Sequence, residues 1–249
     1  MTNIVICGAN GKMGKTIVGC VAERSNCKVV AGIDINTTKY SDFPIYSSPK
    51  DLSENPDVII DYSNPNTLDG LLEHCLVTGT AVVFATTGYN DEQIAKIKKA
   101  SEQIPVFFTF NMSLGINLLV GLAQKAASVL GDRFDVEIIE KHHNLKIDAP
   151  SGTALMLANA INEVYDNSLQ FVYDRHSQRK KRDKKEIGIH SVRGGTIVGE
   201  HEVIFAGNDE VISISHSATS KTVFAEGSIN AAVYLKGKQA GLYDMASLI

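Results

Sequence analysis

Cysteine is scarce in this sequence of 249 residues, at Cys7, Cys20, Cys27 and Cys75. These positions have neither the paired spacing of a zinc site nor the density of a disulfide framework, and three of them lie in apolar runs. We therefore expect reduced thiols that pack as small core residues.

A membrane span, a targeting segment and a strong net charge are also missing from the sequence. No apolar run approaches the length of a membrane span, so no membrane partner is expected. The amino-terminal MTNIVICGANG lacks the basic-then-apolar layout of a signal peptide, which favours a cytoplasmic location. A net charge of -4 offers no general attraction to nucleic acid. Hydrophobic residues at 44% and charged residues at 21% are typical of a soluble globular protein.

The first part of the chain has the layout of a dinucleotide-binding unit. The apolar run Asn3–Cys7 reads as a buried strand, the glycine-rich stretch Gly8–Gly14 follows, and apolar residues then recur at helical spacing. A second apolar run, Lys28–Ile33, ends in Asp34, about 20 residues after the glycines. Glycines let the backbone approach a pyrophosphate at a helix start, and this carboxylate can accept hydrogen bonds from a ribose. The pattern favours cofactor binding over a purely structural glycine turn.

Further apolar runs continue the alternation of strands and helices. Candidate strands lie at residues 57–61, 80–84 and 106–110, with helices at 67–77 and 91–102 between them. The second helix has Asp91 as its candidate cap. This alternation predicts a parallel sheet with right-handed crossovers. Each strand ends in a polar or glycine-containing turn, and open parallel sheets bind ligands at that edge, so these turns are expected to share a cleft.

After a helical stretch at residues 114–130 the pattern changes. Candidate strands lie at 134–140, 169–173, 188–192, 196–206 and 211–216, and a helix spans about 154–164. The last run alternates strictly, and Gly207-Asn208-Asp209 supplies a hairpin turn before it. We expect a second unit with a mixed or antiparallel sheet. A helical pattern at 223–235, with a stop at Gly237, could return the chain to the first unit.

The stretch EKHHNLKIDAPSGTA, residues 140–154, gathers the groups best suited to proton transfer and anion binding. His142, His143 and Lys146 precede Ser151-Gly152-Thr153, which opens the predicted helix. A helix start presents unpaired N–H groups and the positive end of the dipole, and the hydroxyl and glycine complete a receptor for a carboxylate or phosphate. Facing a dinucleotide cleft, such a site suits reduction of an anionic substrate.

Each of these residues also has an ordinary structural reading. A lone histidine is usually structural, and Lys146 alone would be a surface ammonium. Adjacent histidines on a strand face opposite ways, so only one of His142 and His143 would reach a given ligand atom. The same geometry argues against a metal, which needs three or four converging ligands.

Residues 140–154 resemble the signature of the 4-hydroxy-tetrahydrodipicolinate reductase family, formerly dihydrodipicolinate reductase, of the bacterial lysine and diaminopimelate pathway. The pattern E-x-H-H-x-x-K-x-D-A-P-S-G-T-A is met at every fixed position. The resemblance also covers GANGKMG near the start, residues 85–88, FNMS at 110–113, VRGGTIVGEHEVIFAG at 192–207 and GLYDM at 241–245. It therefore spans nearly the whole chain.

The resemblance implies an α/β fold of two domains. A Rossmann-like, doubly wound parallel sheet would comprise residues 1–111 and 218–249 and bind the dinucleotide. Residues 112–217 would form an α+β substrate domain whose mixed sheet, with strands at 196–216, joins four subunits into a homotetramer. The domains would close over substrate at hinges near Asn111 and Ala218.

The implied reaction is reduction of a cyclic dicarboxylate by NADH or NADPH. The 4-hydroxy precursor loses water, and hydride then reaches ring carbon four to give tetrahydrodipicolinate. By position, His142 matches the acid/base histidine and Lys146 the proton donor, while His143 and Ser151-Gly152-Thr153 would hold the substrate. The cofactor-binding residues would be Gly8, Ala9, Asn10, Gly11, Lys12, Met13, Asp34, Ala85, Thr86, Thr87, Thr109, Phe110, Asn111 and Met112.

Lys12 stands where the family commonly has arginine, which opens the question of cofactor preference. Asp34 favours the free ribose hydroxyl of NADH, whereas Lys12 and Lys39 could offset the repulsion of a 2'-phosphate, so both cofactors are expected to work.

Two other functions fit parts of the sequence. One is a dehydrogenase acting on a sugar or amino acid, although the dense signature argues against it. The other is a non-catalytic dinucleotide-sensing regulator, in which the basic run Arg175–Lys185 would contact nucleic acid. That run has no interleaved aromatic residues for stacking bases and reads more simply as a solvated loop; a contact with an anionic cofactor is a further possibility.

Overall fold

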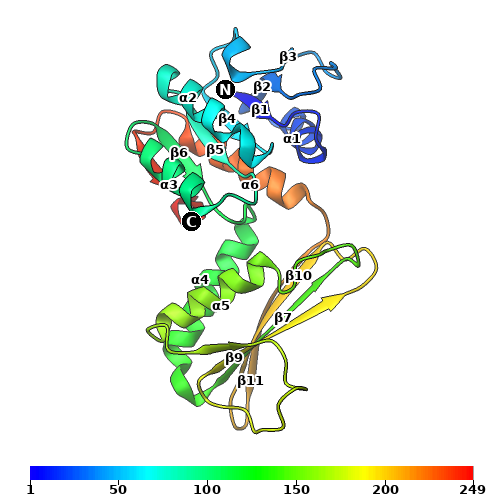
Figure 1. The fold of residues 1–249 in the computed structure, drawn as a ribbon, viewed down its shortest axis with the longest axis vertical. Coiled ribbons are helices and arrows are strands. Elements are labelled where there is room, and N and C mark those ends of the chain that lie inside the picture. The colour runs from blue at the N-terminus through cyan, green and yellow to red at the C-terminus, as the bar shows by residue number, and fades with distance from the viewer. Residues whose placement is uncertain (249) are drawn as a thin grey trace. The chain divides into compact units, whose positions relative to one another are not determined.

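The structure is a computed structural model that describes residues 1–248. It divides into two compact units (Figure 1). Unit 1 comprises Met1–Ser113 together with the chain from Lys221 onward, and unit 2 comprises Leu114–Ser220. The chain therefore leaves unit 1 once, builds unit 2 as one continuous segment, and returns.

Unit 1 contains a seven-stranded sheet in which every strand pair is parallel. The strand order is β12-β6-β5-β4-β1-β2-β3. The strands are β1 (Thr2–Cys7), β2 (Cys27–Ile33), β3 (Ile45–Tyr46), β4 (Val58–Asp61), β5 (Ala81–Phe84), β6 (Pro105–Phe108) and β12 (Gly241–Tyr243). Because β1 lies between β2 and β4, the strand order reverses beside it, and the carboxyl ends of β1 and β4 flank this switch point.

Helices cover both faces of this sheet, as the predicted alternation requires. Helices α1 (Lys12–Ala22) and α6 (Thr222–Leu235) pack on one face, and α2 (Leu68–Thr78) and α3 (Asp91–Ala100) on the other (Figure 1). Every residue of β4 and β5 is buried. Burial on both faces explains why these strands read as continuous apolar runs in the sequence.

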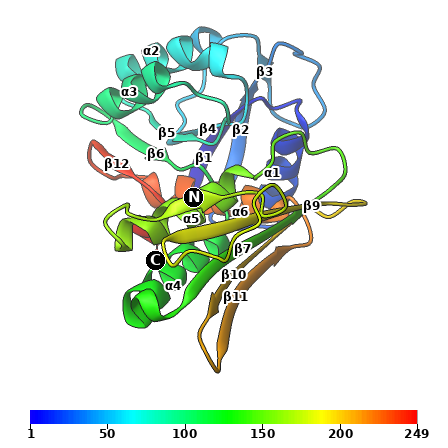
Figure 2. The same cartoon turned by 60° about the horizontal axis from the view of Figure 1, so that its bottom comes forward.

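Unit 2 is built on a five-stranded mixed sheet with the order β11-β10-β7-β9-β8. The strands are β7 (Asp135–His142), β8 (Gln170–Val172), β9 (Glu186–Arg193), β10 (Gly199–Ala206) and β11 (Val211–Ala218). Strand β10 pairs antiparallel with β7 and β11, whereas β9 pairs parallel with β7 and β8. Helices α4 (Leu114–Leu130) and α5 (Gly152–Val164) cover one face (Figures 1 and 2).

The fold class agrees with the sequence-based prediction, but several details differ. The cap of α3 is Asn90, not Asp91, because Asn90 and Gln93 satisfy each other's backbone N–H groups in a capping box. Helix α5 begins at Gly152, slightly before the predicted start. Strands β3 and β12 were not predicted, since such short segments carry no periodicity to detect. Within residues 1–248, four short 3-10 helices lie at Pro49–Asp51, Pro65–Thr67, Gly131–Arg133 and Met245–Leu248.

The expectation that no apolar run is long enough to span a membrane was wrong. Leu114–Arg133 forms a helical segment of 20 residues that is long and apolar enough by length and composition alone. Core helices of soluble proteins pass the same test, so one such helix is weak evidence of a membrane span. Ile116, Leu119 and Ala123 bury one face of it in the core of unit 2.

The basic run at residues 175–185 is tied to acidic side chains of the same unit. Arg175 pairs with Glu137 and Glu186, and Lys180 also pairs with Glu186. Arg182 pairs with Glu137 and with Asp135. Lys184 also pairs with Asp135. The run is mostly exposed, as the sequence predicted, and four of its cations are paired with acidic residues of this sheet.

All four cysteines are free thiols, as the spacing predicted. Cys7, Cys27 and Cys75 are buried.

Candidate functional site

Strand register gathers a polar cluster at one end of the inward face of the unit 2 sheet. Residues of β7 alternate between partly exposed and buried, so Glu140 and His142 continue the buried face begun by Val136 and Ile138. On the neighbouring strands, His201 lies opposite Glu140, and Arg193 lies beside His142. The apolar core of the unit therefore ends in charged and imidazole groups.

Glu140 is the centre of this cluster and is fully buried, at 0% exposure. Arg193 donates Nη1 to Oε2 and Nη2 to Oε1, each at 2.7 Å, a bidentate pairing. The backbone N–H of Ser151 donates to Oε1 at 3.1 Å. Burial alone would raise the pKa of Glu140, but hydrogen bonds from Arg193 and His142 lower it to about 2. Glu140 is therefore a carboxylate at neutral pH.

His142 is 9% exposed, and its Nδ1 lies 2.6 Å from Oε2 of Glu140. Burial lowers its pKa from the ordinary value, against the opposing effect of Glu140. A neutral imidazole beside a carboxylate carries its proton on Nδ1, which leaves Nε2 as the atom able to exchange a proton with a ligand. A Cβ on Gly199 would lie 3.1 Å from that Nε2, so the missing side chain leaves room beside it.

Ser151 joins this cluster to the start of α5. As the N-cap, its Oγ accepts a hydrogen bond from the N–H of Ala154 at 3.2 Å. The same Oγ lies 3.0 Å from Nε2 of His201, whose ring packs edge-on against His142. Burial lowers the pKa of His201 to about 4, so this imidazole is neutral and acts as a fixed hydrogen-bonding group. Gly152 and Thr153 follow at the first positions of the helix.

His143 and Lys146 lie on the loop between β7 and α5. Strand β7 ends at His142, so His143 belongs to the following turn, and the expectation that the two histidines alternate along a strand does not apply. The Nζ of Lys146 is 2.8 Å from Asp148 Oδ1. Hydrogen bonding to Lys146 lowers the pKa of Asp148. Asp148 therefore competes with an anionic ligand for the Lys146 ammonium.

Buried polar atoms without partners lie in the same region. Among the described residues, these include Nδ1 of His143 and Nε of Arg193. A buried donor or acceptor without a partner costs free energy, and an anionic ligand could satisfy some of these atoms. Arg193 Nε is an N–H donor on a cation, so its unpaired state fits a carboxylate-bearing ligand.

The glycine loop of unit 1 has the close packing that a dinucleotide site requires. Gly8 has φ +82°, and a Cβ there would lie 2.5 Å from the carbonyl oxygen of Tyr62. A Cβ on Gly14 would lie 2.3 Å from the carbonyl oxygen of Gly8. Gly11 is the N-cap of α1 and makes no side-chain cap bond, so N–H groups at this helix start are left for a ligand.

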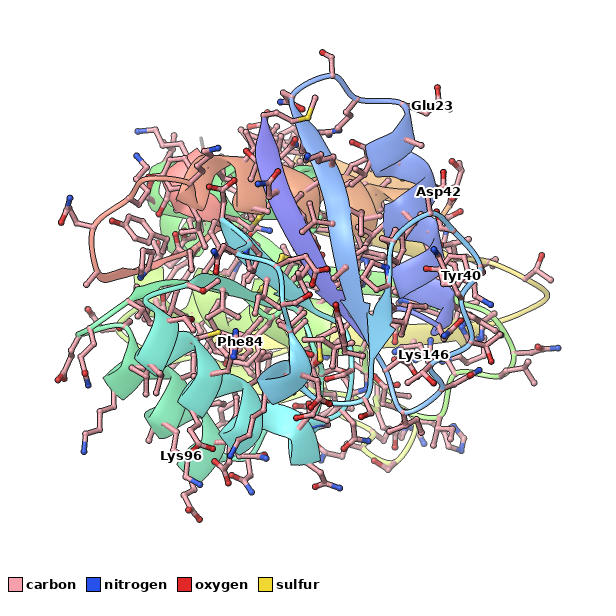
Figure 3. All side chains as sticks on the ribbon, turned by 90° about the horizontal axis from the view of Figure 1, so that it is seen from above. Glu23, Tyr40, Asp42, Phe84, Lys96 and Lys146 are labelled. Atoms are coloured by element: carbon pink, nitrogen blue, oxygen red, sulfur yellow. The ribbon has the colours of Figure 1, made fainter. Side chains whose placement is uncertain are left out.

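Asp34 follows β2, where its carboxylate organises the loop. Oδ2 accepts a hydrogen bond from the N–H of Asn10 at 2.8 Å, and Oδ1 accepts one from Asn36 at 3.0 Å. Each oxygen retains a lone pair that could accept from a ribose hydroxyl. Tyr40, on the loop beside α1, donates to the carbonyl oxygen of Ala9 at 2.8 Å (Figure 3). Residues 8–14 and Asp34 thus fit a bound dinucleotide.

The turns after β5 and β6 contain the other predicted cofactor residues. Ala85 and Thr86 are buried and Thr87 is exposed; the Thr86 hydroxyl donates to Asp61 at 2.8 Å. Phe110 is 73% exposed and makes an edge contact with Phe108. The remaining positions are Thr109, which contacts Asn111, and Met112, whose side chain is buried in the core. Met112 can therefore offer a ligand only its backbone. Lys12 is exposed and Met13 packs partly into the core.

Sequence reasoning missed several residues that the structure places in these clusters. Glu140 lies in the recognised stretch, but its role depends on its partner Arg193, which is distant in sequence, as is His201, which lies opposite it on β10 and contacts Ser151. Asp61 was seen only as a strand end. The alternation of β7 could have indicated that Glu140 faces inward with His142.

Comparison with known proteins identifies the family. The chain matches "Dihydrodipicolinate reductase, N-terminus" over residues 2–112 and "Dihydrodipicolinate reductase, C-terminus" over residues 115–249. It is 50% identical to a 4-hydroxy-tetrahydrodipicolinate reductase of Caldanaerobacter subterraneus subsp. tengcongensis over 249 residues, covering 100% of this chain and 98% of the relative. An enzyme of the same name from Clostridium tetani is 43% identical, with 100% and 97% covered.

Solved structures agree on the fold. A dipicolinate-bound dihydrodipicolinate reductase from Paenisporosarcina sp. TG-14 superposes with a TM-score of 0.82 at 27% identity, covering 100% of this chain and 99% of that one. A probable dehydrogenase from Thermotoga maritima has a TM-score of 0.62 at 12% identity, covering 98% and 92%, and this second likeness concerns the fold alone.

Proposed function

The chain belongs to the dihydrodipicolinate reductase family, a family of pyridine-nucleotide-dependent reductases of lysine biosynthesis, and we propose its reaction and the roles of its residues. The reaction is NAD(P)H-dependent reduction of 4-hydroxy-tetrahydrodipicolinate, by way of dihydrodipicolinate, to tetrahydrodipicolinate. Unit 1 binds the dinucleotide and unit 2 binds the cyclic dicarboxylate. The observation that carries the proposal is the pairing of His142 with Glu140 near the start of α5. Nδ1 of His142 lies 2.6 Å from Oε2 of Glu140.

The bound cofactor supplies a hydride for ring carbon four of the substrate. His142, with Nδ1 held by Glu140, exchanges a proton through Nε2. Lys146 leaves Asp148 for the substrate, adds Coulomb attraction to a carboxylate and donates a proton. The N–H groups of Gly152 and Thr153, with the Ser151 hydroxyl and His143, hold a carboxylate at the helix start.

The cofactor site is proposed to comprise the glycine loop, Asp34 and the turns after β5 and β6. Both NADH and NADPH should serve, because Asp34 keeps lone pairs for a ribose hydroxyl while the exposed Lys12 and Lys39 can neutralise a 2'-phosphate. The Michaelis constants for the two cofactors decide this point. A preference beyond roughly a hundredfold, about 2.7 kcal/mol, would contradict dual use.

A cytoplasmic homotetramer assembled through the unit 2 sheet completes the proposal. Val211 and Ile212 on the edge strand β11 are exposed, at 63% and 36%, which gives that edge apolar surface for a second subunit. Light scattering coupled to gel filtration measures the assembly, and a monomer at micromolar concentration would contradict it.

The regulatory alternative has less support than the enzymatic one. Its nucleic-acid contact would need the basic run, yet Arg175, Lys180, Arg182 and Lys184 are paired with acidic side chains. A salt-dependent DNA-binding assay tests it, since phosphate contacts make affinity fall steeply with salt.

The direct test of the proposed reaction follows the absorbance of NADH or NADPH with freshly generated substrate. Substrate-dependent oxidation is the expected result. Oxidation that does not depend on substrate, or none at all, would overturn the proposed reaction, and His142→Ala distinguishes the enzyme's own activity from a contaminant's.

A further inference from the structure

Asp61, the last residue of β4, is a fully buried carboxylate whose partners are neutral. It is 0% exposed. Thr86 Oγ1 and the Tyr89 hydroxyl each donate to Oδ2 at 2.8 Å, while the backbone N–H of Ser63 donates to Oδ1 at 3.1 Å and the Ser63 hydroxyl donates there too. Within residues 1–248, no lysine, arginine or histidine forms an ion pair with it.

Such a group is unusual, because aspartate is almost never fully buried without a paired cation. The hydroxyl and N–H donors satisfy its lone pairs, but none of them is a cation that could compensate a carboxylate charge. Neighbouring groups respond to this charge. Burial and Asp61 together raise the pKa of Cys75 to about 12, and they also raise the pKa values of Tyr89 and Cys7.

The strand order shows which part of a bound dinucleotide would lie near this charge. The glycine loop follows β1 and receives the pyrophosphate, while Asp34 follows β2 and receives a ribose on that side. The other half of the dinucleotide must then extend across the switch point, over the carboxyl ends of β4 and β5 (Figure 1). Asp61 ends β4, and its partners Thr86 and Tyr89 follow β5. In a dinucleotide bound in this way, the nicotinamide half would be the one nearer this uncompensated carboxylate.

We propose that Asp61 is an electrostatic positioning residue that favours the oxidised, cationic nicotinamide over the reduced, neutral one. This inference rests on the proposed function. In the reaction, the nicotinamide gives up two electrons and one proton as hydride and its ring gains a positive charge, while the substrate carbon is reduced. A negative charge buried beneath that site stabilises the charge as it develops, and the low polarity of the protein interior strengthens the effect. Its hydrogen bonds to Thr86 and Tyr89 also fix the loop after β5.

The test measures dissociation constants of NAD+ and NADH for the full chain, by calorimetry and by nicotinamide fluorescence. In Asp61→Asn, which removes the charge and keeps the shape, the ratio of the NAD+ constant to the NADH constant should rise on the order of tenfold, the scale of one charge acting in a protein interior. If Asp61 had a purely structural role, the variant would bind NAD+ and NADH more weakly to the same extent. The ratio of the two constants would then be unchanged, and that result would overturn the proposal.

Two control variants make the result specific. Asp57→Asn removes another carboxylate of unit 1, one that is paired with Lys236, and should leave the ratio unchanged. Tyr89→Phe removes one neutral donor and keeps the Asp61 charge, so the preference for NAD+ should rise by about twofold because the charge is less shielded. If Asp61→Asn does not fold, Tyr89→Phe decides alone, and an unchanged or lower preference for NAD+ overturns the proposal.

Failure here differs from failure of the proposed function. A chain that binds neither nucleotide contradicts the function. A chain that binds both, with a ratio insensitive to Asp61, contradicts only this inference.

Discussion

Asp61 in unit 1 and Glu140 in unit 2 are two carboxylates that look alike in position and differ in their partners. Both are 0% exposed, and both lie at or near the carboxyl end of a strand. Glu140 receives both Nη atoms of Arg193 and the His142 ring. Among residues 1–248, the side chain of Asp61 receives neutral groups alone, namely hydroxyls, a backbone N–H and the Cys7 thiol. One charge is neutralised by its neighbours, whereas the other remains unpaired.

This difference separates two uses of a buried acid. A paired carboxylate such as Glu140 fixes geometry, because it sets the tautomer of His142 and holds the Ser151 backbone at the helix start. An unpaired carboxylate such as Asp61 keeps a long-range field, which suits a site where positive charge develops. The proton chemistry and the hydride chemistry would thus each depend on their own buried acid.

The largest expected effect comes from breaking the Glu140 pairing. Arg193→Met removes the guanidinium and leaves Glu140 buried with the His142 ring and the Ser151 N–H but without a permanent cation. Loss of one partner of a buried pair typically costs about 3–5 kcal/mol, so the free energy of unfolding in urea should fall by that amount. Adding Glu140→Gln to this variant should restore much of the loss, since no unpaired charge remains. If Arg193→Met alone were as stable as the wild type, the ion pair between Arg193 and Glu140 would not be what stabilises the buried carboxylate.

The proposed proton-transfer residues come next. His142→Ala and Lys146→Ala should each lower turnover by about 10² or more, the usual scale for a positioned acid/base group, with cofactor affinity nearly unchanged. His176→Ala and Lys181→Ala are matched controls, because both residues are exposed on the basic run of the same unit. Steady-state kinetics measure the change, and wild-type turnover in either variant would show that its role is misassigned.

Glu140→Gln should alter the pH dependence of this site. Burial lowers the pKa of His142 and Glu140 raises it, so the variant should titrate His142 at lower pH, as followed by its ring proton resonances. The pKa of Glu140 is lowered from 4.5 to about 2, so its contribution to stability is present above pH 4.5 and is lost as the pH falls toward about 2. The difference in the free energy of unfolding between wild type and Glu140→Gln should therefore shrink as the pH falls through that window. A difference that stays constant from pH 5 to pH 2 would contradict this prediction.

The smallest expected effect concerns Asp148. Asp148→Asn removes the charge that holds Lys146 at 2.8 Å, and an exposed pair of this kind contributes roughly 0–1 kcal/mol. The Michaelis constant for the dicarboxylate should fall by about threefold or less, because Lys146 no longer has to leave a charged partner. A rise in that constant would indicate that Asp148 helps to position Lys146.

Most of the fold could be predicted because its elements carry long, regular patterns. Buried parallel strands such as β4 read as apolar runs, and the glycine loop with Asp34 has a fixed spacing. Helix α4 matched its predicted bounds. Strand β12 could not be predicted, because its place depends on pairing with β6 rather than on its own residues.

The candidate site was only partly predictable, for a similar reason. His142, Lys146 and Ser151 are close in sequence, so one motif contains them. Arg193 and His201 reach the same cluster only through the registers of β9 and β10 with β7. Asp61 is unpaired because the fold brings no cationic side chain to it, and the residues next to it in the sequence do not indicate this.

The most direct test of the contrast between the two acids is the ratio of the NAD+ and NADH dissociation constants, measured side by side in Asp61→Asn and Glu140→Gln. The account predicts a rise on the order of tenfold in Asp61→Asn and no change in Glu140→Gln, because the charge of Glu140 is already compensated by Arg193. An equal shift in both variants, or a shift in Glu140→Gln alone, would contradict it.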